Sequence, residues 1–307
     1  MSTISRRHFL GTAAVSATTL ALTGPSTVQA ATDLRQYEPN LRDRLWMWGH
    51  GPDTLWGYPE NYKIPEGNKI DMADAIESMG IPNVCVIRWL GKPEPPFDEY
   101  VKQFRKTKRV AWSIIDSAKQ SYEQKKRWAF ELCGKMPNLV NLFLDDFFIG
   151  RAGAQAGETL YPAHLSLKQL EELRKEMEGL KKKTDLSVVL YSRQLHPEIK
   201  HHIDYCNVVS YWTWDATDLT ALENNFNKYR EIVPDKPTLL GIYMWDFGGK
   251  KPVTMDLMKH QLDFALKKFQ QKQIEGMIFH CTPLVDLGLE AVDYSRKWIA
   301  EHGDLVR

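Results

Sequence analysis

The sequence is poor in cysteine and has no excess of charge of either sign. Its 307 residues include four cysteines, and 40 Lys and Arg residues balance 39 Asp and Glu residues, for a formal charge of +1. This balance argues against nucleic-acid binding, which needs a clustered basic surface to replace the counterions of the phosphates. Cys85, Cys133, Cys206 and Cys281 are widely spaced and show no metal-finger or CxxC spacing. We expect buried thiols at positions 85, 206 and 281, and we predict no metal site.

The N-terminal region lacks an apolar run long enough for a membrane anchor. Its weakly apolar stretch, Gly11–Leu22, is shorter than the roughly 20 residues that a bilayer requires. It follows the pair Arg6-Arg7 and precedes Val28-Gln29-Ala30, which is typical of a signal-peptidase cleavage site. This order is that of an export signal, and the paired arginines resemble the twin-arginine (Tat) type. We therefore predict a cleaved signal over residues 1–30 and a periplasmic or extracellular domain over residues 31–307.

Beyond residue 30, short apolar segments alternate with amphipathic ones. The apolar segments are rich in β-branched and aromatic residues, which is typical of buried strands. The eight predicted strands are Leu45–Trp48, Asn83–Trp89, Val110–Asp116, Leu139–Phe148, Ser187–Arg193, Asn207–Trp214, Thr238–Trp245 and Gly276–Cys281. The predicted helices are Ile70–Ser78, Asp98–Lys106, Lys119–Gly134, Leu167–Lys183, His196–His202, Asp218–Ile232, Thr254–Gln271 and Leu287–Glu301.

Eight strand–helix repeats predict an α/β protein built as a single (β/α)8 TIM barrel. Such alternation favours a parallel sheet with right-handed crossovers, and the predicted mature length is close to the ~250 residues of a single barrel. An open doubly wound sheet would carry a glycine-rich phosphate turn after its first strand. Trp48-Gly49-His50-Gly51-Pro52 is not such a turn, and we predict no cofactor.

The aromatic residues are the unusual feature, with ten Trp, twelve Tyr and twelve Phe. Active sites of TIM barrels lie at the carboxyl ends of the strands. Seven of the ten Trp fall at or just beyond these ends, namely Trp46, Trp48, Trp56, Trp89, Trp212, Trp214 and Trp245. Because alternate strand residues face opposite sides, we expect three or four of them to contact a ligand and the others to pack against helices.

Indoles interleaved with Asp, Arg and Tyr are suited to a sugar, whose C–H faces pack on rings while its hydroxyls bind polar groups. The predicted substrate-binding residues are Trp48, His50, Arg88, Trp89, Asp116, Tyr191, Arg193, Trp212, Trp214, Trp245 and His280. His50 and His280 are expected to bind hydroxyls or orient a carboxylate, because paired histidines at metal-ligand spacing are missing. The adjacent His201 and His202 cannot both face one site.

Carboxylates supply the candidate chemistry, since glycoside hydrolysis uses one protonated and one ionised carboxyl group. The predicted catalytic residues are Asp145, Asp146, Asp215 and Asp246. Asp145 and Asp146 follow an apolar run, and strand alternation predicts that only Asp145 faces inward unless a bulge intervenes. The partner carboxylate is expected from Asp215 or Asp246, with Asp116 as a third candidate.

The segment Leu144-Asp145-Asp146-Phe147-Phe148 and the Trp-Asp pairs at positions 214–215 and 245–246 resemble secreted TIM-barrel glycoside hydrolases. The placement is similar to that of the α-galactosidase-type clan, whose catalytic Asp residues follow strands 4 and 6. The segment Asn207–Asp215 is distantly similar to the strand-6 Met-x-Tyr-Asp segment of chitinase-type barrels. The chitinase-type DxxDxDxE motif and the two-Glu pattern of cellulase-type barrels are both missing.

These features lead to the hypothesis of an exported glycoside hydrolase acting on a poly- or oligosaccharide. A non-catalytic carbohydrate-binding barrel is the first alternative. The second is a hydrolase or lyase that holds an anionic substrate with Arg88 and Arg193. The segment Gly150–His164, rich in Gly and Ala, is expected to act as a lid or subsite wall. The sequence predicts neither the oligomeric state nor the glycan.

Overall fold

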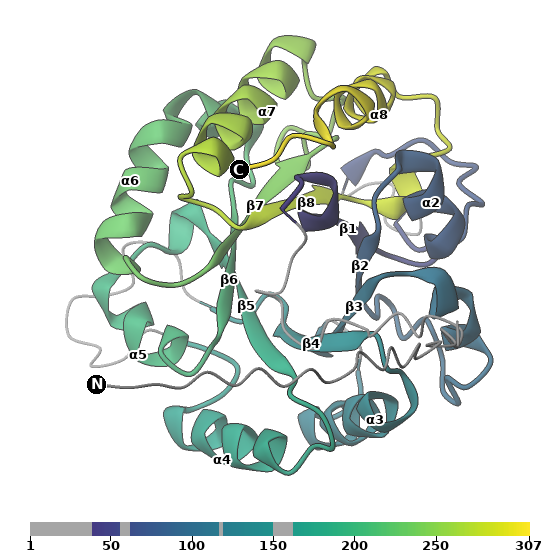
Figure 1. Ribbon diagram of the computed structural model, residues 1–307, viewed down its shortest axis with the longest axis vertical. Helices are drawn as coiled ribbons and strands as arrows, with labels where there is room; N and C mark the ends of the chain where they lie inside the picture. Colours follow the sequence, from purple (N-terminus) through teal and green to yellow (C-terminus); the bar gives the residue numbers. More distant parts are fainter. Residues whose placement is uncertain (1–38, 56–61, 117–118, 150–161) are drawn as a thin grey trace, which may run out of the picture.

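Eight parallel strands form a closed barrel in the order β1 to β8. The structure is a computed structural model and describes residues 39–55, 62–116, 119–149 and 162–307. The predicted signal, Trp56 and most of the predicted lid lie outside these residues. The strands are β1 Leu45–Gly49, β2 Asn83–Val86, β3 Arg109–Ile115, β4 Leu139–Leu144, β5 Asp185–Tyr191, β6 Val208–Trp212, β7 Thr238–Tyr243 and β8 Gly276–His280. Figure 1 shows them as an inner ring surrounded by helices. The predicted single (β/α)8 barrel is confirmed.

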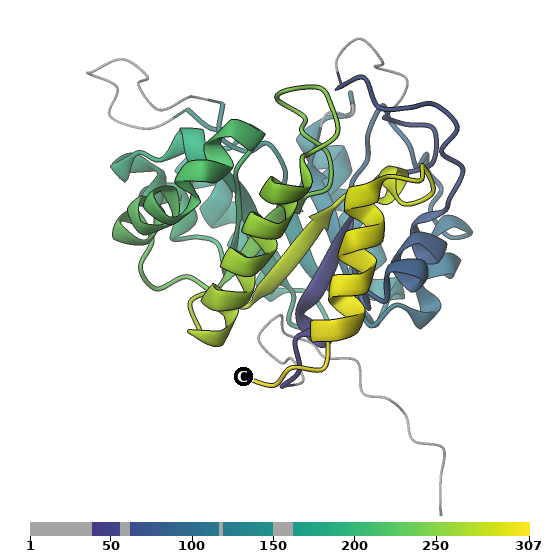
Figure 2. The same ribbon diagram turned by 90° about the horizontal axis from the view of Figure 1, so that it is seen from above.

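The barrel closes by pairing its first and last strands. β1 runs parallel to β8, with Leu45 opposite Met277 and Trp48 opposite His280. Figure 2 shows β1, β8 and helix α8 (Glu290–His302) side by side at this seam. Residues far apart in the sequence, such as Trp48 and His280, therefore lie side by side along this seam.

The helices follow the apolar periodicity of the sequence. Helix α4 keeps Leu170, Leu173 and Met177 buried on one stripe and begins with a capping box between Ser166 and Gln169. The other α-helices are α2 Met72–Met79, α3 Tyr122–Lys135, α5 Lys200–Ile203, α6 Leu222–Ile232 and α7 Met255–Gln270. The predicted helix over residues 98–106 is instead the 3₁₀-helix η2, Tyr100–Lys106. No helix within the described ranges is long and apolar enough to span a membrane.

Seven of the eight strands end earlier than the apolar runs predicted, β2 and β4 by the largest margins. β2 stops at Val86, and Trp89 pairs with Lys92 in an isolated bridge that encloses Leu90 and Gly91, both at positive φ. β4 stops at Leu144, because the chain turns at Asp145 and Asp146. In both places apolar residues continue past the last strand residue, so hydrophobicity alone did not mark the end.

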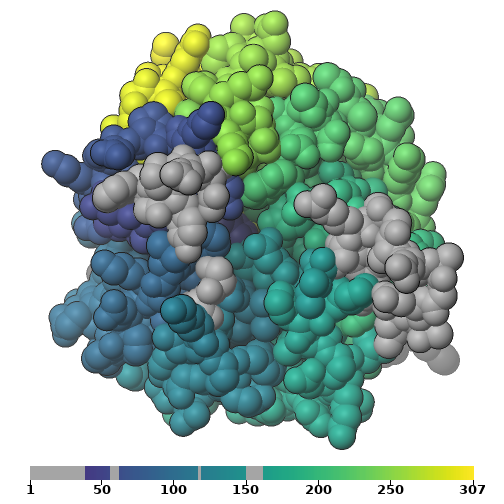
Figure 3. Space-filling model, turned by 180° about the vertical axis from the view of Figure 1, so that it is seen from behind, coloured from purple at the N-terminus to yellow at the C-terminus, as the bar shows by residue number. Residues whose placement is uncertain are grey.

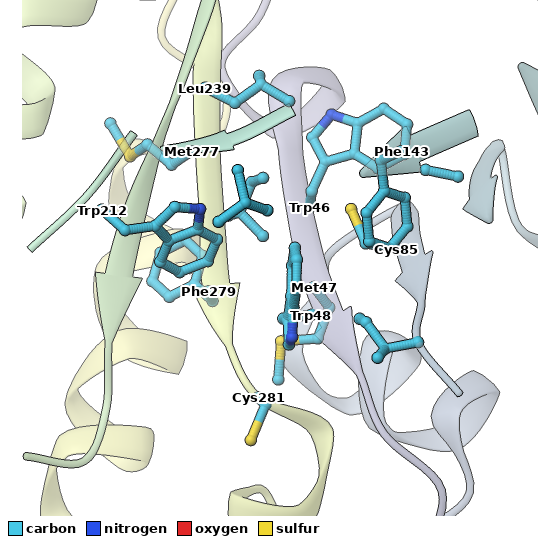
Figure 4. Close-up of a cluster of buried hydrophobic side chains, with 14 of the residues drawn as sticks. Trp46, Met47, Trp48, Cys85, Phe143, Trp212, Leu239, Met277, Phe279 and Cys281 are labelled. Carbon is cyan, nitrogen blue, oxygen red and sulfur yellow. The ribbon is translucent and has the colours of Figure 1, made fainter. Parts of the chain in front are cut away.

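The barrel interior combines large rings with a few small polar side chains. Trp46, Phe143 and Leu239 line it together with Asn141 and Ser187, and Figure 4 shows the three apolar side chains within the ring of strands. The Asn141 amide donates a 2.7 Å hydrogen bond to the Ser187 hydroxyl. The inward position of Asn141 and Phe143 confirms the parity predicted for this strand.

One glycine makes room for a large ring in this interior. A Cβ atom on Gly241 of β7 would lie 1.9 Å from Cε3 of Trp212 on the neighbouring strand β6. The indole can therefore lie flat across β7 only because residue 241 has no side chain. The position of Trp212 depends on this glycine.

Candidate active site

A pocket opens at the carboxyl ends of the strands, which is the face shown in Figure 3. It encloses about 490 Å³, including the part that opens to solvent. Its walls are predominantly aromatic, with two carboxyl groups and two imidazoles among them. The lining residues are Trp48, His50, Leu55, Tyr62, Trp89, Asp145, Asp146, Tyr191, Trp212, Trp214, Tyr243, Phe247 and His280.

Asp145 is a buried carboxyl group at the carboxyl end of β4. Its backbone N–H donates a 3.1 Å hydrogen bond to the carbonyl of Ile115, which anchors the turn to the end of β3. Burial raises the pKa of Asp145 well above its usual value, and the negative charges of Asp146 and Asp116 raise it further. Asp145 therefore holds its proton at a pH where an exposed carboxyl group would have lost it.

Asp146 also faces the pocket, although adjacent strand residues normally face opposite sides. Its backbone has φ 44°, a left-handed conformation that ends the strand alternation and brings both carboxyl groups to the same pocket. The Tyr191 hydroxyl donates a 2.8 Å hydrogen bond to Oδ1 of Asp146. Burial, followed by the charge of Asp146, raises the pKa of Tyr191 well above its usual value, so the phenol remains a donor.

Asp145 and Asp146 are thus two neighbouring carboxyl groups in different surroundings. One is enclosed and keeps its proton, and the other accepts a hydrogen bond from a phenol. A pair of carboxyl groups whose environments differ is the arrangement that separates an acid from a base in one site.

Aromatic rings from the ends of β6 and β7 and from the segments that follow them form one wall of the pocket. The ring centroids of Trp212 and Tyr243 are 5.3 Å apart, and those of Trp214 and Phe247 are 5.6 Å apart. Trp48 packs edge to face on Trp212 at 5.2 Å. Four of the predicted tryptophans, Trp48, Trp89, Trp212 and Trp214, line the pocket, and Figure 4 shows Trp48 and Trp212 pointing into the barrel.

Two carboxylates predicted as catalytic partners lie outside the pocket wall. Oδ1 of Asp246 accepts hydrogen bonds from the backbone N–H groups of Gly249, at 2.7 Å, and Ala216, at 3.4 Å. Asp215 is exposed and packs so closely on Gly248 that a Cβ atom there would lie 1.7 Å from Oδ1 of Asp215. Both carboxylates therefore brace the loop that follows β7.

Two charged residues predicted to bind substrate are engaged in structural contacts. The guanidinium of Arg88 donates to the carbonyls of Pro93 and Gly91, both at 3.0 Å, and lies over the Trp128 ring. Asp116 forms a 2.6 Å ion pair with Lys125 of α3, and both side chains are almost fully buried. Neither residue lines the pocket.

The remaining predicted residues divide between the pocket margin and the packing around it. Arg193 lies next to the pocket, with its guanidinium 4.3 Å from the Tyr191 ring centroid and 5.5 Å from that of Trp214. Trp245 is buried behind the wall, where its indole N–H donates to the Tyr62 carbonyl at 3.0 Å. Trp46 belongs to the deeper interior layer.

Sequence reasoning missed three aromatic residues of the pocket. Tyr243 shares strand parity with Leu239 and Gly241, so alternation along β7 could have placed it inside the barrel. Tyr62 and Phe247 lie in the segments that follow β1 and β7, outside the strands, where strand alternation does not predict orientation. The phenol of Tyr243 remains protonated, because burial and the charge of Asp146 raise its pKa well above its usual value.

Within the described part of the chain, no group of three or more His, Cys, Asp or Glu side chains could hold a metal ion. The four cysteines are all buried and free, as predicted for Cys85, Cys206 and Cys281.

No protein-family model matches the chain, and no curated protein matches it in sequence. Solved structures share its fold. A chitinase catalytic domain from Pyrococcus furiosus superposes with a TM-score of 0.51 at 14% identity, covering 88% of this chain and 98% of the other. A putative alpha-L-fucosidase from Bacteroides thetaiotaomicron gives 0.52 at 11% identity, covering 86% and 98%. Concanavalin B gives 0.50 at 9% identity, covering 85% and 100%. These similarities support the barrel fold.

Proposed function

We propose that the protein is a glycoside hydrolase that acts on a poly- or oligosaccharide, with Asp145 and Asp146 as its two catalytic carboxyl groups. The observation that carries the proposal is the pairing of the buried Asp145 carboxyl group, whose pKa burial raises, with the hydrogen-bonded carboxyl group of Asp146 in one aromatic pocket. This pairing supplies the proton donor and the carboxylate that glycosidic cleavage needs.

In this mechanism Asp145 is the general acid. It transfers its proton to the glycosidic oxygen as the C–O bond breaks, so that the leaving sugar departs as a neutral alcohol. The carboxylate of Asp146, held by Tyr191, faces the positive charge that develops on the sugar ring. It acts there either as the nucleophile or as the base that deprotonates the attacking water.

The aromatic walls would bind the sugar through its C–H faces, with Trp212, Trp214 and Trp48 as the principal surfaces. Two fold neighbours are described as a chitinase and a putative alpha-L-fucosidase, which agrees with action on a glycosidic bond. We also propose that the protein acts outside the cytoplasm, because residues 1–30 have the arrangement of a Tat signal.

Turnover of a panel of aryl glycosides and polysaccharides tests the proposal. Asp145→Asn and Asp146→Asn should each abolish hydrolysis of the best substrate while retaining binding. Asp215→Asn should retain turnover, because Asp215 lies outside the pocket. An aryl glycoside with an acidic phenol as leaving group needs little protonation, so Asp145→Asn should lose least on it.

The outcomes separate the alternatives. Sugar binding without turnover in the wild-type protein would refute the hydrolase and favour a carbohydrate-binding barrel. Selective turnover of anionic substrates would favour the second alternative if that turnover is lost in Arg193→Gln. Arg193 alone, without Arg88, would then hold the anionic group of the substrate. Loss of turnover in Asp215→Asn would instead indicate that the second catalytic carboxylate comes from the loops after β6 and β7.

A further inference from the structure

Two imidazoles face the carboxyl pair across the pocket. Asp145 and Asp146 follow β4, whereas His280 ends β8 and His50 follows β1. In the closed order β1 to β8, strand β8 lies opposite β4. The centroids of the His50 and His280 rings are 5.8 Å apart, and both rings line the pocket. The pocket therefore has a carboxyl side and an imidazole side.

Each ring presents one nitrogen to the pocket. Nδ1 of His50 and Nδ1 of His280 are buried and have no hydrogen-bond partner among the described residues. Nε2 of neither ring is among these buried atoms without a partner, and both residues line the pocket, which points to Nε2 as the nitrogen that faces it. Buried N–H groups without partners are rarer than buried acceptors without partners, so the ring proton belongs on Nε2. Two N–H donors then point into the pocket.

Burial opposes a positive charge on both rings. Burial lowers the pKa of His50 to about 3, and burial together with the neighbouring His50 lowers that of His280 well below its usual value. An uncharged pair of N–H donors binds the oxygen of a hydroxyl group. It supplies no positive charge that would balance a buried anion.

The pair is held rigidly by contacts that involve neither Nε2 atom. The backbone N–H of His50 donates to Oγ1 of Thr282 at 3.0 Å, and that hydroxyl donates back to the His50 carbonyl at 2.7 Å. The ring of His280 is enclosed by Phe247 at 4.6 Å and Tyr243 at 5.1 Å. The main chain of His50 and the ring of His280 are therefore held in place before a ligand arrives, which limits the ordering cost of binding.

We propose that His50 and His280 form a hydroxyl-recognition subsite for an uncharged sugar. The subsite binds the edge of the sugar ring that lies farthest from the scissile bond. This inference rests on the proposed function, because it takes the sugar to have its scissile oxygen at Asp145. When the leaving group lies at the carboxyl side of the pocket, the hydroxyls on the far edge of the same sugar ring reach the imidazole side. His50 and His280 would then determine which sugar is accepted.

Binding of methyl glycosides tests the subsite independently of turnover. The probes are methyl β-D-glucopyranoside, methyl β-D-galactopyranoside, methyl α-L-fucopyranoside and methyl β-D-glucuronide, and the readouts are calorimetry and the NMR signals of the histidine Cε1–H groups. We expect a neutral glycoside to shift the signals of His50 and His280 and to bind more tightly than the glucuronide. His50→Phe and His280→Phe should each weaken binding roughly 3- to 10-fold, the size of one neutral hydrogen bond.

A matched control and a conservative variant separate recognition from folding. His202→Phe replaces another buried histidine, which packs on Phe147 and Phe148 away from the pocket, and should leave binding unchanged. His280→Gln retains an N–H donor and should recover part of the affinity if His280→Phe folds poorly. A monodeoxy analogue of the best glycoside should bind wild type and the Phe variant equally weakly. Removing the hydroxyl and the imidazole together should therefore weaken binding no more than removing either one.

The results distinguish failure of the subsite from failure of the proposed function. Unchanged affinity in both Phe variants, or glucuronide binding at least as tight as that of every neutral glycoside, overturns the subsite even if glycosides are hydrolysed. Histidine-dependent binding without hydrolysis of any glycoside supports the subsite and refutes the hydrolase. Absence of binding by all four probes overturns the subsite.

Discussion

The hydroxyl of Tyr191 donates a 2.8 Å hydrogen bond to Oδ1 of Asp146 across the gap between β5 and the turn after β4. The phenol thereby fixes a carboxylate that the left-handed turn has brought into the pocket. Because the acceptor is a carboxyl group, this contact is among the stronger hydrogen bonds of the pocket, although Asp146 itself is exposed. It links the aromatic wall to the carboxyl pair.

Removal of this hydroxyl should impair catalysis. A hydrogen bond to a charged group contributes about 1.5–3 kcal/mol, so Tyr191→Phe should lower kcat roughly 10- to 100-fold on the best glycoside. Steady-state kinetics checks this prediction. Tyr211→Phe is the matched control, since Tyr211 is buried outside the pocket against Tyr229 at 4.5 Å. Equal losses in the two variants would contradict the role given to Tyr191.

The raised pKa of Asp145 predicts an alkaline limit to activity. The protonated form is the proposed acid, so kcat/KM should fall as pH rises through the folded-state pKa of Asp145. A pH–rate profile of wild type on a substrate with a poor leaving group measures this limb. On a substrate with an acidic phenol the limb should weaken, and an identical limb on both substrates would speak against Asp145 as the acid.

The same group predicts how stability changes with pH. The unfolded chain loses this proton near pH 3.9, whereas folded Asp145 retains it to a higher pH. Between these two pKa values the folded state therefore binds more protons than the unfolded state. The free energy of unfolding declines as pH rises through this range. Asp145→Asn should raise the Tm at pH 7 and give a smaller gain at pH 4. Asp263→Asn, at an exposed position of α7, should leave the pH dependence unchanged.

The buried ion pair between Lys125 and Asp116 should support the fold rather than bind substrate. Lys125→Met leaves the Asp116 carboxylate buried without its ammonium partner, 2.6 Å away in the native protein, and should cost about 3–5 kcal/mol. Denaturant unfolding measures the loss. The double variant Lys125→Met/Asp116→Leu should recover most of it, and a double variant as unstable as the single one would refute this account.

A single methyl group on β7 should disturb the pocket. In Gly241→Ala the new Cβ would overlap the Trp212 ring at 1.9 Å, which should cost about 1–3 kcal/mol in stability and lower turnover by displacing the ring. Gly134→Ala is the matched control, because nothing lies within 4 Å of its Cβ position in α3. That change should be neutral or stabilise the protein by up to about 1 kcal/mol, with no effect on turnover.

The sequence was sufficient to predict the barrel, because all eight strands are apolar runs separated by amphipathic segments. The pocket was predicted in part. Trp48, Trp212 and His280 lie on strands whose alternation fixes their direction. Strand alternation predicted that Asp145 faces the barrel interior and that Asp146 faces outward. The left-handed backbone at Asp146 ends this alternation. No residue pattern marks such a turn.

The predicted site residues that do not line the pocket show the complementary limit. Arg88 and Asp246 lie near strand ends, but carbonyl and N–H groups of the adjoining loops engage their side chains. Whether a charged residue binds a ligand or its own loop depends on backbone positions that the sequence does not specify. Tyr62 and Phe247 reach the pocket from the segments after β1 and β7, where strand alternation does not apply.

The register of the β1–β8 seam, with Trp48 opposite His280, has a consequence for how the protein folds. These residues are separated by almost the whole described chain, and such distant contacts form slowly because a long loop must close. The imidazole side of the pocket therefore forms only when the first and last strands meet, whereas β4 and β5 can assemble the carboxyl side earlier. During refolding, recovery of ligand binding should follow recovery of helical signal, which would make binding a reporter of barrel closure.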